Sequence, residues 1–134
     1  MKSFDTNVVV RLLIKDDPEQ CERAGVAWRQ AIIEGGAFLS VTVLVEVTWV
    51  LRDACKLDRA TIAAALRRLV DSEGVAIEHE ALVRHAIDSF EGGAADFSDY
   101  VILESSRSAG ACPVVTFDQR FAREPDVQLV APKQ

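Results

Sequence analysis

Short apolar runs recur along the chain and are separated by longer segments in which apolar residues follow a helical spacing. Short runs of this kind, bounded by turn residues, predict buried strands. We expect five strands: Ser3–Phe4 with the residues before them, Ala37–Val41, Val75–Ile77, Pro113–Phe117 and Val127–Val130.

Amphipathic helices are predicted between these strands. One begins after Asp17-Pro18, an N-cap residue followed by proline at the first helical position. A second begins near Asp58 and ends at Gly74, and a third carries Val83, Ala86, Ile87 and Phe90. Alternating strands and helices indicate an α/β domain around a mostly parallel sheet. No repeat or linker divides the sequence, so we expect one domain over residues 1–134.

The charge balance is acidic, with 15 Lys and Arg against 21 Asp and Glu, for a net charge of −6. An acidic chain is a poor general binder of DNA or of anionic membranes. The longest uncharged stretch, Gly35 to Val45, is far shorter than the roughly 20 residues that span a bilayer. No signal peptide is evident, so we expect a soluble, cytoplasmic protein without a membrane partner.

The cysteines and histidines do not form a metal-binding pattern. Cys21, Cys55 and Cys112 lie far apart, which excludes a disulfide framework or a zinc cluster, and we expect three small core residues. His79 and His85 lie among charged neighbours and are expected to be solvated helix residues.

Five carboxylates lie where a core-building pattern would not place them. Asp5 and Asp118 each close a predicted strand, Asp96 and Asp99 begin a helix, and Glu46 is the only charge between Ala37 and Leu51. The carboxyl ends of parallel strands meet at one edge of a sheet, so these acids are expected to lie close together. Like charges raise one another's pKa, and a divalent cation relieves the repulsion. An all-oxygen ligand set favours Mg²⁺ or Mn²⁺.

Structural alternatives exist for each of these acids. Glu46 is expected to be buried, and burying an unpaired carboxylate is costly. The alternative is a helix whose polar stripe holds Thr42, Glu46 and Trp49, or a buried Glu–Arg pair. The aspartates are also plausible helix caps, and the Asp96–Asp99 spacing is typical of a capping box.

These motifs, in this order and at these separations, resemble those of the PIN-domain endoribonucleases, specifically the VapC-type toxins of bacterial toxin–antitoxin pairs. The resemblance covers nearly the whole chain. The motifs are Asp5-Thr6-Asn7 with Arg11 behind it, Ser40 and Glu46 in SVTVLVEV, Asp96-Phe97-Ser98-Asp99, and Thr116-Phe117-Asp118 before Arg120-Phe121. One departure follows Asp99, where Tyr100 and the run Glu104-Ser105-Ser106 stand in place of small apolar residues.

The resemblance implies a three-layer α/β/α sandwich around a central, mostly parallel sheet. It also implies Mg²⁺- or Mn²⁺-dependent hydrolysis of RNA phosphodiester bonds, in which a metal-bound water attacks phosphorus. Four residues take the roles of catalytic acids and metal ligands: Asp5, Glu46, Asp99 and Asp118. Asp96 becomes an accessory acid. Hydrogen-bonding support for the carboxylates comes from Thr6, Asn7, Ser40 and Thr116.

RNA must still approach a net-negative protein. Basic residues near the motifs are candidates to hold its phosphates, above all Arg11, Arg52 and Arg120. The resemblance further implies a homodimer and a cognate VapB-type antitoxin whose C-terminal segment covers the acidic groove.

Two other functions compete with this interpretation. A haloacid-dehalogenase-like phosphatase also places Asp after its first strand, but it needs a second Asp where this chain has Asn7. A non-catalytic PIN-like module that binds a partner is the other alternative, and the complete acidic set argues against it.

Overall fold

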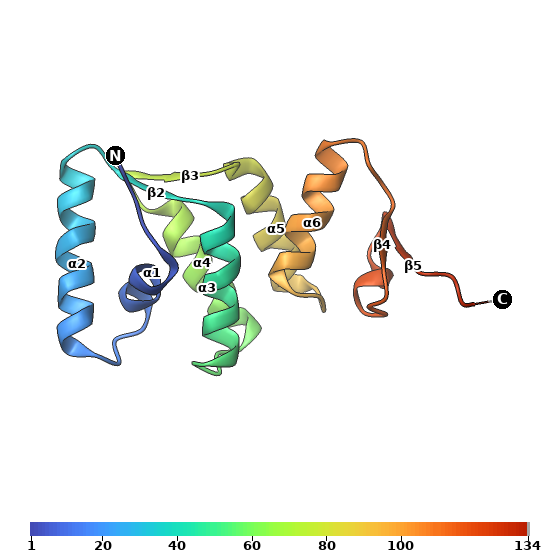
Figure 1. Cartoon of the computed structure of the whole chain (residues 1–134), viewed down its shortest axis with the longest axis horizontal. Coiled ribbons are helices and arrows are strands. Elements are labelled where there is room, and N and C mark those ends of the chain that lie inside the picture. Colours follow the sequence, from blue (N-terminus) through green and yellow to red (C-terminus); the bar gives the residue numbers. More distant parts are fainter. Residues whose placement is uncertain (134) are drawn as a thin grey trace.

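The computed structural model describes residues 1–133 and shows an α/β protein in which parallel strands are flanked by helices (Figure 1). The strands are β1 (Lys2–Ser3), β2 (Ala37–Leu39), β3 (Val75–Ile77), β4 (Val114–Thr116) and β5 (Val127–Leu129). The helices are α1 (Thr6–Leu13), α2 (Pro18–Ile33), α3 (Val41–Asp53), α4 (Arg59–Asp71), α5 (Glu80–Gly92), α6 (Phe97–Ser108) and the 3₁₀ turn η1 (Phe121–Arg123). The predicted α/β class with a parallel sheet is confirmed.

Side-chain caps set where several helices begin. Asp5, Asp17, Ser40 and Asp58 each accept a backbone N–H of the first turn of the helix that follows. Such caps satisfy donors that have no partner within the helix. Because Ser40 caps α3, Val41 is already helical, and β2 is shorter than the predicted run Ala37–Val41.

The main sheet has the order β1-β2-β3, with all strands parallel. Ala37 pairs with Lys2 on one side and with Val75 on the other. Gly36 enters β2 with φ +113°, and a Cβ there would lie 2.8 Å from the Gly74 carbonyl oxygen. Only glycine allows the two chain segments to approach this closely.

The core lies between this sheet and the helices. Helices α4 and α5 bury the predicted apolar faces, including Ile62, Leu66, Val83 and Ile87. Helix α2 buries only Ala24 and Ala31 fully, and the half-buried Trp28 packs edge-on against Phe4 with ring centroids 5.1 Å apart.

The cysteines depart from the prediction of three core residues. Cys21 and Cys55 are half-buried, and Cys112 is exposed because it lies in the segment before β4 that leaves the core. The expectation of solvated histidines is confirmed, since both His79 and His85 are exposed. Every helix within residues 1–133 is too short or too polar to cross a membrane.

Strands β4 and β5 form a second, separate parallel sheet rather than joining the first. This C-terminal unit (residues 114–129) lies beyond α6, on the side away from β1–β3 (Figure 1). Helix α6 anchors it through Tyr100, whose buried ring packs edge-on against the buried Phe121 and whose hydroxyl donates to Glu124 Oε1 at 2.8 Å. The predicted single central sheet is thus divided into two sheets. Tyr100, which the sequence analysis noted as a departure from the motif, connects α6 to the C-terminal unit.

Candidate metal and nucleic-acid site

Asp5 and Glu46 are brought together by Thr6. The Asp5 carboxylate caps α1 by accepting the Thr6 backbone N–H at 2.7 Å. The Thr6 hydroxyl donates to Glu46 Oε1 at 2.9 Å, which links the start of α1 to the middle of α3. Thr6 is buried, whereas both carboxylates are exposed. The two acids therefore share one positioning residue and face solvent.

The expected burial of Glu46 is wrong. On α3 the buried positions are Leu44, Val47, Thr48 and Leu51, which form the inner face of the helix. Thr42, Glu46 and Trp49 lie on the opposite, exposed stripe. The helical alternative considered for this residue is the arrangement found, because a 3.6-residue repeat can turn one charge to water despite apolar neighbours in sequence.

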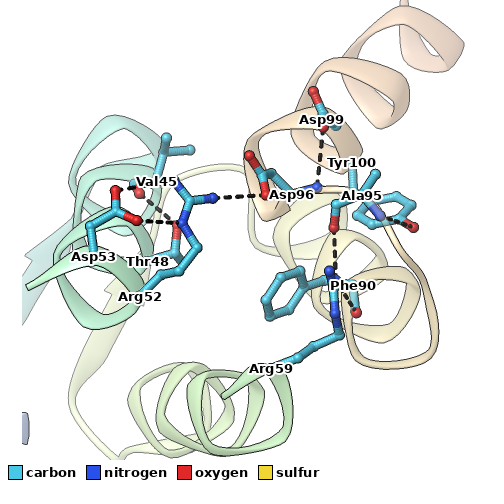
Figure 2. Close-up of polar contacts among 10 residues, drawn as sticks. All are labelled: Val45, Thr48, Arg52, Asp53, Arg59, Phe90, Ala95, Asp96, Asp99 and Tyr100. Carbon is cyan, nitrogen blue, oxygen red and sulfur yellow. Dashed lines mark hydrogen bonds and ion pairs between the residues drawn. The ribbon is translucent and has the colours of Figure 1, made fainter. Parts of the chain in front are cut away.

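Asp96 and Asp99 lie at the start of α6 (Figure 2). They form the predicted capping box, in which the Asp96 backbone N–H donates to Asp99 Oδ2 at 3.1 Å. Partial burial raises the pKa of Asp99, and the nearby negative charges of Asp96 and Asp118 raise it further. One oxygen of the Asp99 carboxylate is thus already engaged in a hydrogen bond that caps its own helix.

Arg52 occupies the position between α3 and the start of α6 (Figure 2). One of its terminal nitrogens lies 2.8 Å from Asp96 Oδ1, and its Nε lies 2.8 Å from Asp53 Oδ1. These hydrogen bonds raise the pKa of the guanidinium, so Arg52 keeps its charge. A phosphate that binds Arg52 has to compete with two carboxylates.

Asp118 follows β4 in the exposed C-terminal unit. Its Oδ1 accepts the backbone N–H groups of Arg120 at 2.8 Å and of Phe121 at 3.3 Å, and so orders the turn before η1. Thr116 holds the same turn from the other side, since its hydroxyl oxygen accepts the Asp118 backbone N–H at 3.0 Å. Arg120 is exposed beside this turn.

The remaining predicted support residues have local partners. Ser40 Oγ accepts the Val43 backbone N–H, and Asn7 is exposed on α1. Arg11 pairs with Asp16 at 2.7 Å and also donates to Gln20. Asn7 and Arg11 line an open groove of about 340 Å³ between α1 and α2.

The acids do not converge into one cluster. Within residues 1–133, no group of three or more His, Cys, Asp or Glu side chains is placed to hold a metal ion. Asp5 and Glu46 are joined through Thr6, whereas Asp96 and Asp99 lie at the start of α6 and Asp118 follows β4. As arranged here, the described carboxylates do not place three donors around one divalent ion. The physical reason is the separation of β4 from β1, since convergence required both strands to end at the same sheet edge.

One positioning residue was missed by the sequence reasoning. Arg59, at the first position of α4, donates to the carbonyl oxygens of Phe90 and Ala95 at 2.9 and 2.7 Å and lies 4.5 Å from the Phe90 ring centroid (Figure 2). It holds the loop that leads into Asp96. The partners are more than 30 residues away in sequence, so no local pattern marks this contact.

The comparison with family models matches the PIN domain over residues 3–126. The match spans most of the chain, and the protein therefore belongs to the PIN-domain family. PIN domains are mostly metal-dependent nucleases and generally use divalent metals. A comparison with curated proteins finds no match.

Proposed function

We propose that this protein is a Mg²⁺- or Mn²⁺-dependent endoribonuclease and the toxin of a type II toxin–antitoxin pair. The observation that carries the proposal is the PIN-domain match over residues 3–126, which contains all four acids of the motif: Asp5, Glu46, Asp99 and Asp118. These four are proposed as the catalytic acids and metal ligands, with Asp96 as an accessory acid.

The chain's own contacts support roles for the residues around these acids. Thr6 orients Glu46 through its hydroxyl and Asp5 through its backbone N–H. Arg52 fixes Asp96 and neutralises part of the negative charge at the start of α6. Holding carboxylates in one orientation reduces the reorganisation that binding a cation requires.

RNA binding is proposed to use the cations that flank the acids. Arg120 is exposed two residues after Asp118, and Arg11 lines the groove between α1 and α2. Guanidinium groups bind phosphate through two parallel hydrogen bonds. These residues offset the overall charge of −6 along the path of a phosphate backbone.

The proposed partners are a cognate VapB-type antitoxin and a second copy of the chain. An arginine or lysine of the antitoxin would pair with the exposed carboxylates of Asp5 and Glu46 and so block the site. Co-expression of the chain with the gene beside its own, followed by purification through a tag on the toxin, tests this pairing.

Cleavage of RNA by the purified protein tests the nuclease. We expect cleavage with Mg²⁺ or Mn²⁺, loss of cleavage in EDTA, and a reduction of at least about 100-fold in Asp5→Asn and Glu46→Gln. Asp88→Asn is the matched control, because Asp88 is an exposed acid on α5 that pairs with Arg67. Cleavage that survives EDTA, or that Asp88→Asn removes as fully as Asp5→Asn, contradicts the proposal.

A non-catalytic module that binds a partner is the second candidate. The separation of Asp5 and Glu46 from Asp118 favours it, because the residues described do not form a metal cluster. This candidate predicts RNA or protein binding with no cleavage under any metal. The phosphatase alternative is displaced by the PIN-domain match.

A further inference from the structure

A small cavity lies between α3, α4 and the start of α6. Its volume is about 110 Å³. One water molecule takes up roughly 30 Å³ of the liquid, and pockets for drug-sized ligands begin at about 300 Å³. The cavity is therefore larger than one water needs and smaller than such a pocket, a size that suits a single planar ring system.

The deeper part of the cavity is apolar. Ile62, Phe90 and Phe97 line it and are buried, and the half-buried Leu57 lines it from the loop between α3 and α4. The rings of Phe90 and Phe97 meet edge-on, with centroids 6.1 Å apart. Aromatic and aliphatic walls of this kind bind flat aromatic ligands better than they bind small ions.

An ion pair lines the same cavity. A terminal nitrogen of Arg52 lies 2.8 Å from Asp96 Oδ1 (Figure 2). Arg52 also gives hydrogen bonds from Nε and its second terminal nitrogen to Asp53, so each terminal nitrogen keeps one further N–H. A carboxylate oxygen accepts more than one hydrogen bond, so Asp96 keeps acceptor positions as well. The pair therefore presents donors beside acceptors.

The polar groups around the cavity are held in place before any ligand binds. Arg59 lines the cavity and donates to the carbonyl oxygens of Phe90 and Ala95, which fixes the residue before Asp96. Thr48, another lining residue, is buried and donates its hydroxyl to the Val45 carbonyl oxygen at 2.7 Å. Groups that are already ordered reduce the entropy lost when a ligand binds.

The edge of guanine matches this pair of charged side chains. On its Watson–Crick edge guanine presents the acceptor O6 beside two donors, N1–H and the N2 amino group. Uracil places its single donor between two acceptors, and adenine and cytosine place an amino group beside a ring-nitrogen acceptor. Arginine commonly donates to guanine O6, and proteins read the bases of single-stranded RNA on this edge.

We propose that this cavity binds a guanine base of single-stranded RNA, with Arg52 donating to O6 and Asp96 accepting from N1–H and the N2 amino group. The assignment rests on the proposed nuclease function and deepens it, because it names a base that the substrate carries. Asp99 follows three residues after Asp96, and Glu46 precedes Arg52 by six residues, about 9 Å along the axis of α3. A base held here belongs to a nucleotide close to the bond that is cleaved.

Binding of matched RNAs tests the base. The full-length Asp5→Asn protein in Mg²⁺ is used, so that the RNA stays intact under the proposed function. Labelled oligouridylates with one internal guanosine, inosine or adenosine are compared with the all-uridine strand by fluorescence anisotropy. We expect guanosine to bind on the order of 10-fold tighter than adenosine or uridine, with inosine, which lacks the N2 amino group, between them. Equal affinities, or no binding of any strand, overturn the proposal.

Two substitutions in the same protein remove the groups that read the base. Arg52→Ala removes the donor to O6, and Asp96→Asn removes one acceptor but keeps a residue type that caps helices well. Each is expected to lose most of the preference for guanosine over adenosine. A lost phosphate contact would instead weaken all strands equally. Variants that weaken every strand and keep the full preference overturn the proposal.

Arg67→Ala is the matched control. Arg67 pairs with Asp88 and Glu91, so its removal also takes one partly exposed guanidinium from two carboxylates. It lies on α4 and does not line the cavity. We expect this variant to keep the preference for guanosine. Loss of the preference in Arg67→Ala as large as in Arg52→Ala would assign the effect to overall charge and overturn the proposal.

A free guanine nucleotide carries the same base edge, so guanosine 5′-monophosphate is measured as a competitor. The RNA assignment predicts that the nucleotide competes far more weakly than the unlabelled guanosine strand, because it lacks the neighbouring phosphates. Equal competition would make the cavity a site for free nucleotides and overturn the RNA assignment.

The cavity and the nuclease fail separately. Guanosine-selective binding by a chain that cleaves no RNA with any metal supports the cavity and contradicts the nuclease. Metal-dependent cleavage by the wild type, with no preference for guanosine in binding, supports the nuclease and contradicts the cavity.

Discussion

The hydroxyl of Thr6 donates a hydrogen bond to Glu46 Oε1 across 2.9 Å, and this contact joins the two helices that carry the first two acids of the motif. The same residue donates its backbone N–H to Asp5. Thr6 is buried, whereas the two carboxylates are exposed. The buried residue therefore orients both exposed acids through its hydrogen bonds.

Thr6→Val is expected to impair activity more than stability. Valine keeps the shape and β-branch but leaves Glu46 Oε1 without its donor. Loss of such a supporting hydrogen bond costs about 10–100-fold in metal affinity or activity. Cleavage rates of Thr6→Val and Thr6→Ser measure the effect, with serine expected to retain most activity. Equal losses in the two variants would assign the effect to packing instead.

Removal of Arg52 is expected to weaken RNA binding with little change in stability. Its ion pairs with Asp53 and Asp96 are partly exposed, and such pairs contribute about 0–1 kcal/mol to folding. If Arg52 contacts one phosphate, Arg52→Ala lowers affinity and reduces the slope of log K against log salt by about one. Fluorescence anisotropy at several salt concentrations measures the slope. Asp53→Asn, which keeps the Asp96 contact, serves as control, and an unchanged slope in Arg52→Ala excludes the phosphate contact.

Arg59→Ala is expected to destabilise the fold. The side chain donates to the carbonyl oxygens of Phe90 and Ala95, and hydrogen bonds from a charged group contribute about 1.5–3 kcal/mol. Urea unfolding is expected to show a loss in this range, and Arg68→Ala, an exposed change on the same helix, is expected to show almost none. Equal urea midpoints for Arg59→Ala and Arg68→Ala would mean that other contacts hold the loop before Asp96.

The cap of α4 is expected to give a pH-dependent contribution to stability. Hydrogen bonds from Thr61 lower the pKa of Asp58 in the folded protein. A lowered folded-state pKa stabilises the fold above the unfolded value of about 3.9, and this stability is lost as the pH falls through the folded value. Thermal unfolding of the wild type and Asp58→Ala is therefore expected to differ at pH 7 and to converge in acid. A Tm difference that stays constant down to pH 2 contradicts this assignment.

Much of the fold can be predicted from the sequence because the patterns that mark where helices begin are local. Asp17-Pro18 and Asp58 mark helix starts through the hydrogen bonds of the first turn, and both helices begin where predicted. The Asp96–Asp99 capping box is local in the same way. The predicted burial of Glu46 is wrong. The residues around it are apolar, but the helical repeat of α3 places Glu46 on the exposed face.

The arrangement of the site depends on contacts that no local pattern contains. The α/β pattern predicts parallel strands but not their order, so the separation of β4 from β1 could not be anticipated. Tyr100 appeared in the sequence only as a departure from the motif, and its contacts with Phe121 and Glu124 now hold the C-terminal unit. Arg59 donates to the Ala95 carbonyl oxygen from a distant part of the sequence, so no local pattern around Asp96 predicts this contact.

The dependence of RNA cleavage on Mn²⁺ concentration tests the central claim most directly. The account predicts a rate that rises to saturation with Mn²⁺ for the wild type and for Asp88→Asn, and a rate near background at every concentration for Asp5→Asn. A wild-type protein that stays at background across the titration, or an Asp5→Asn protein that follows the wild-type curve, would contradict it.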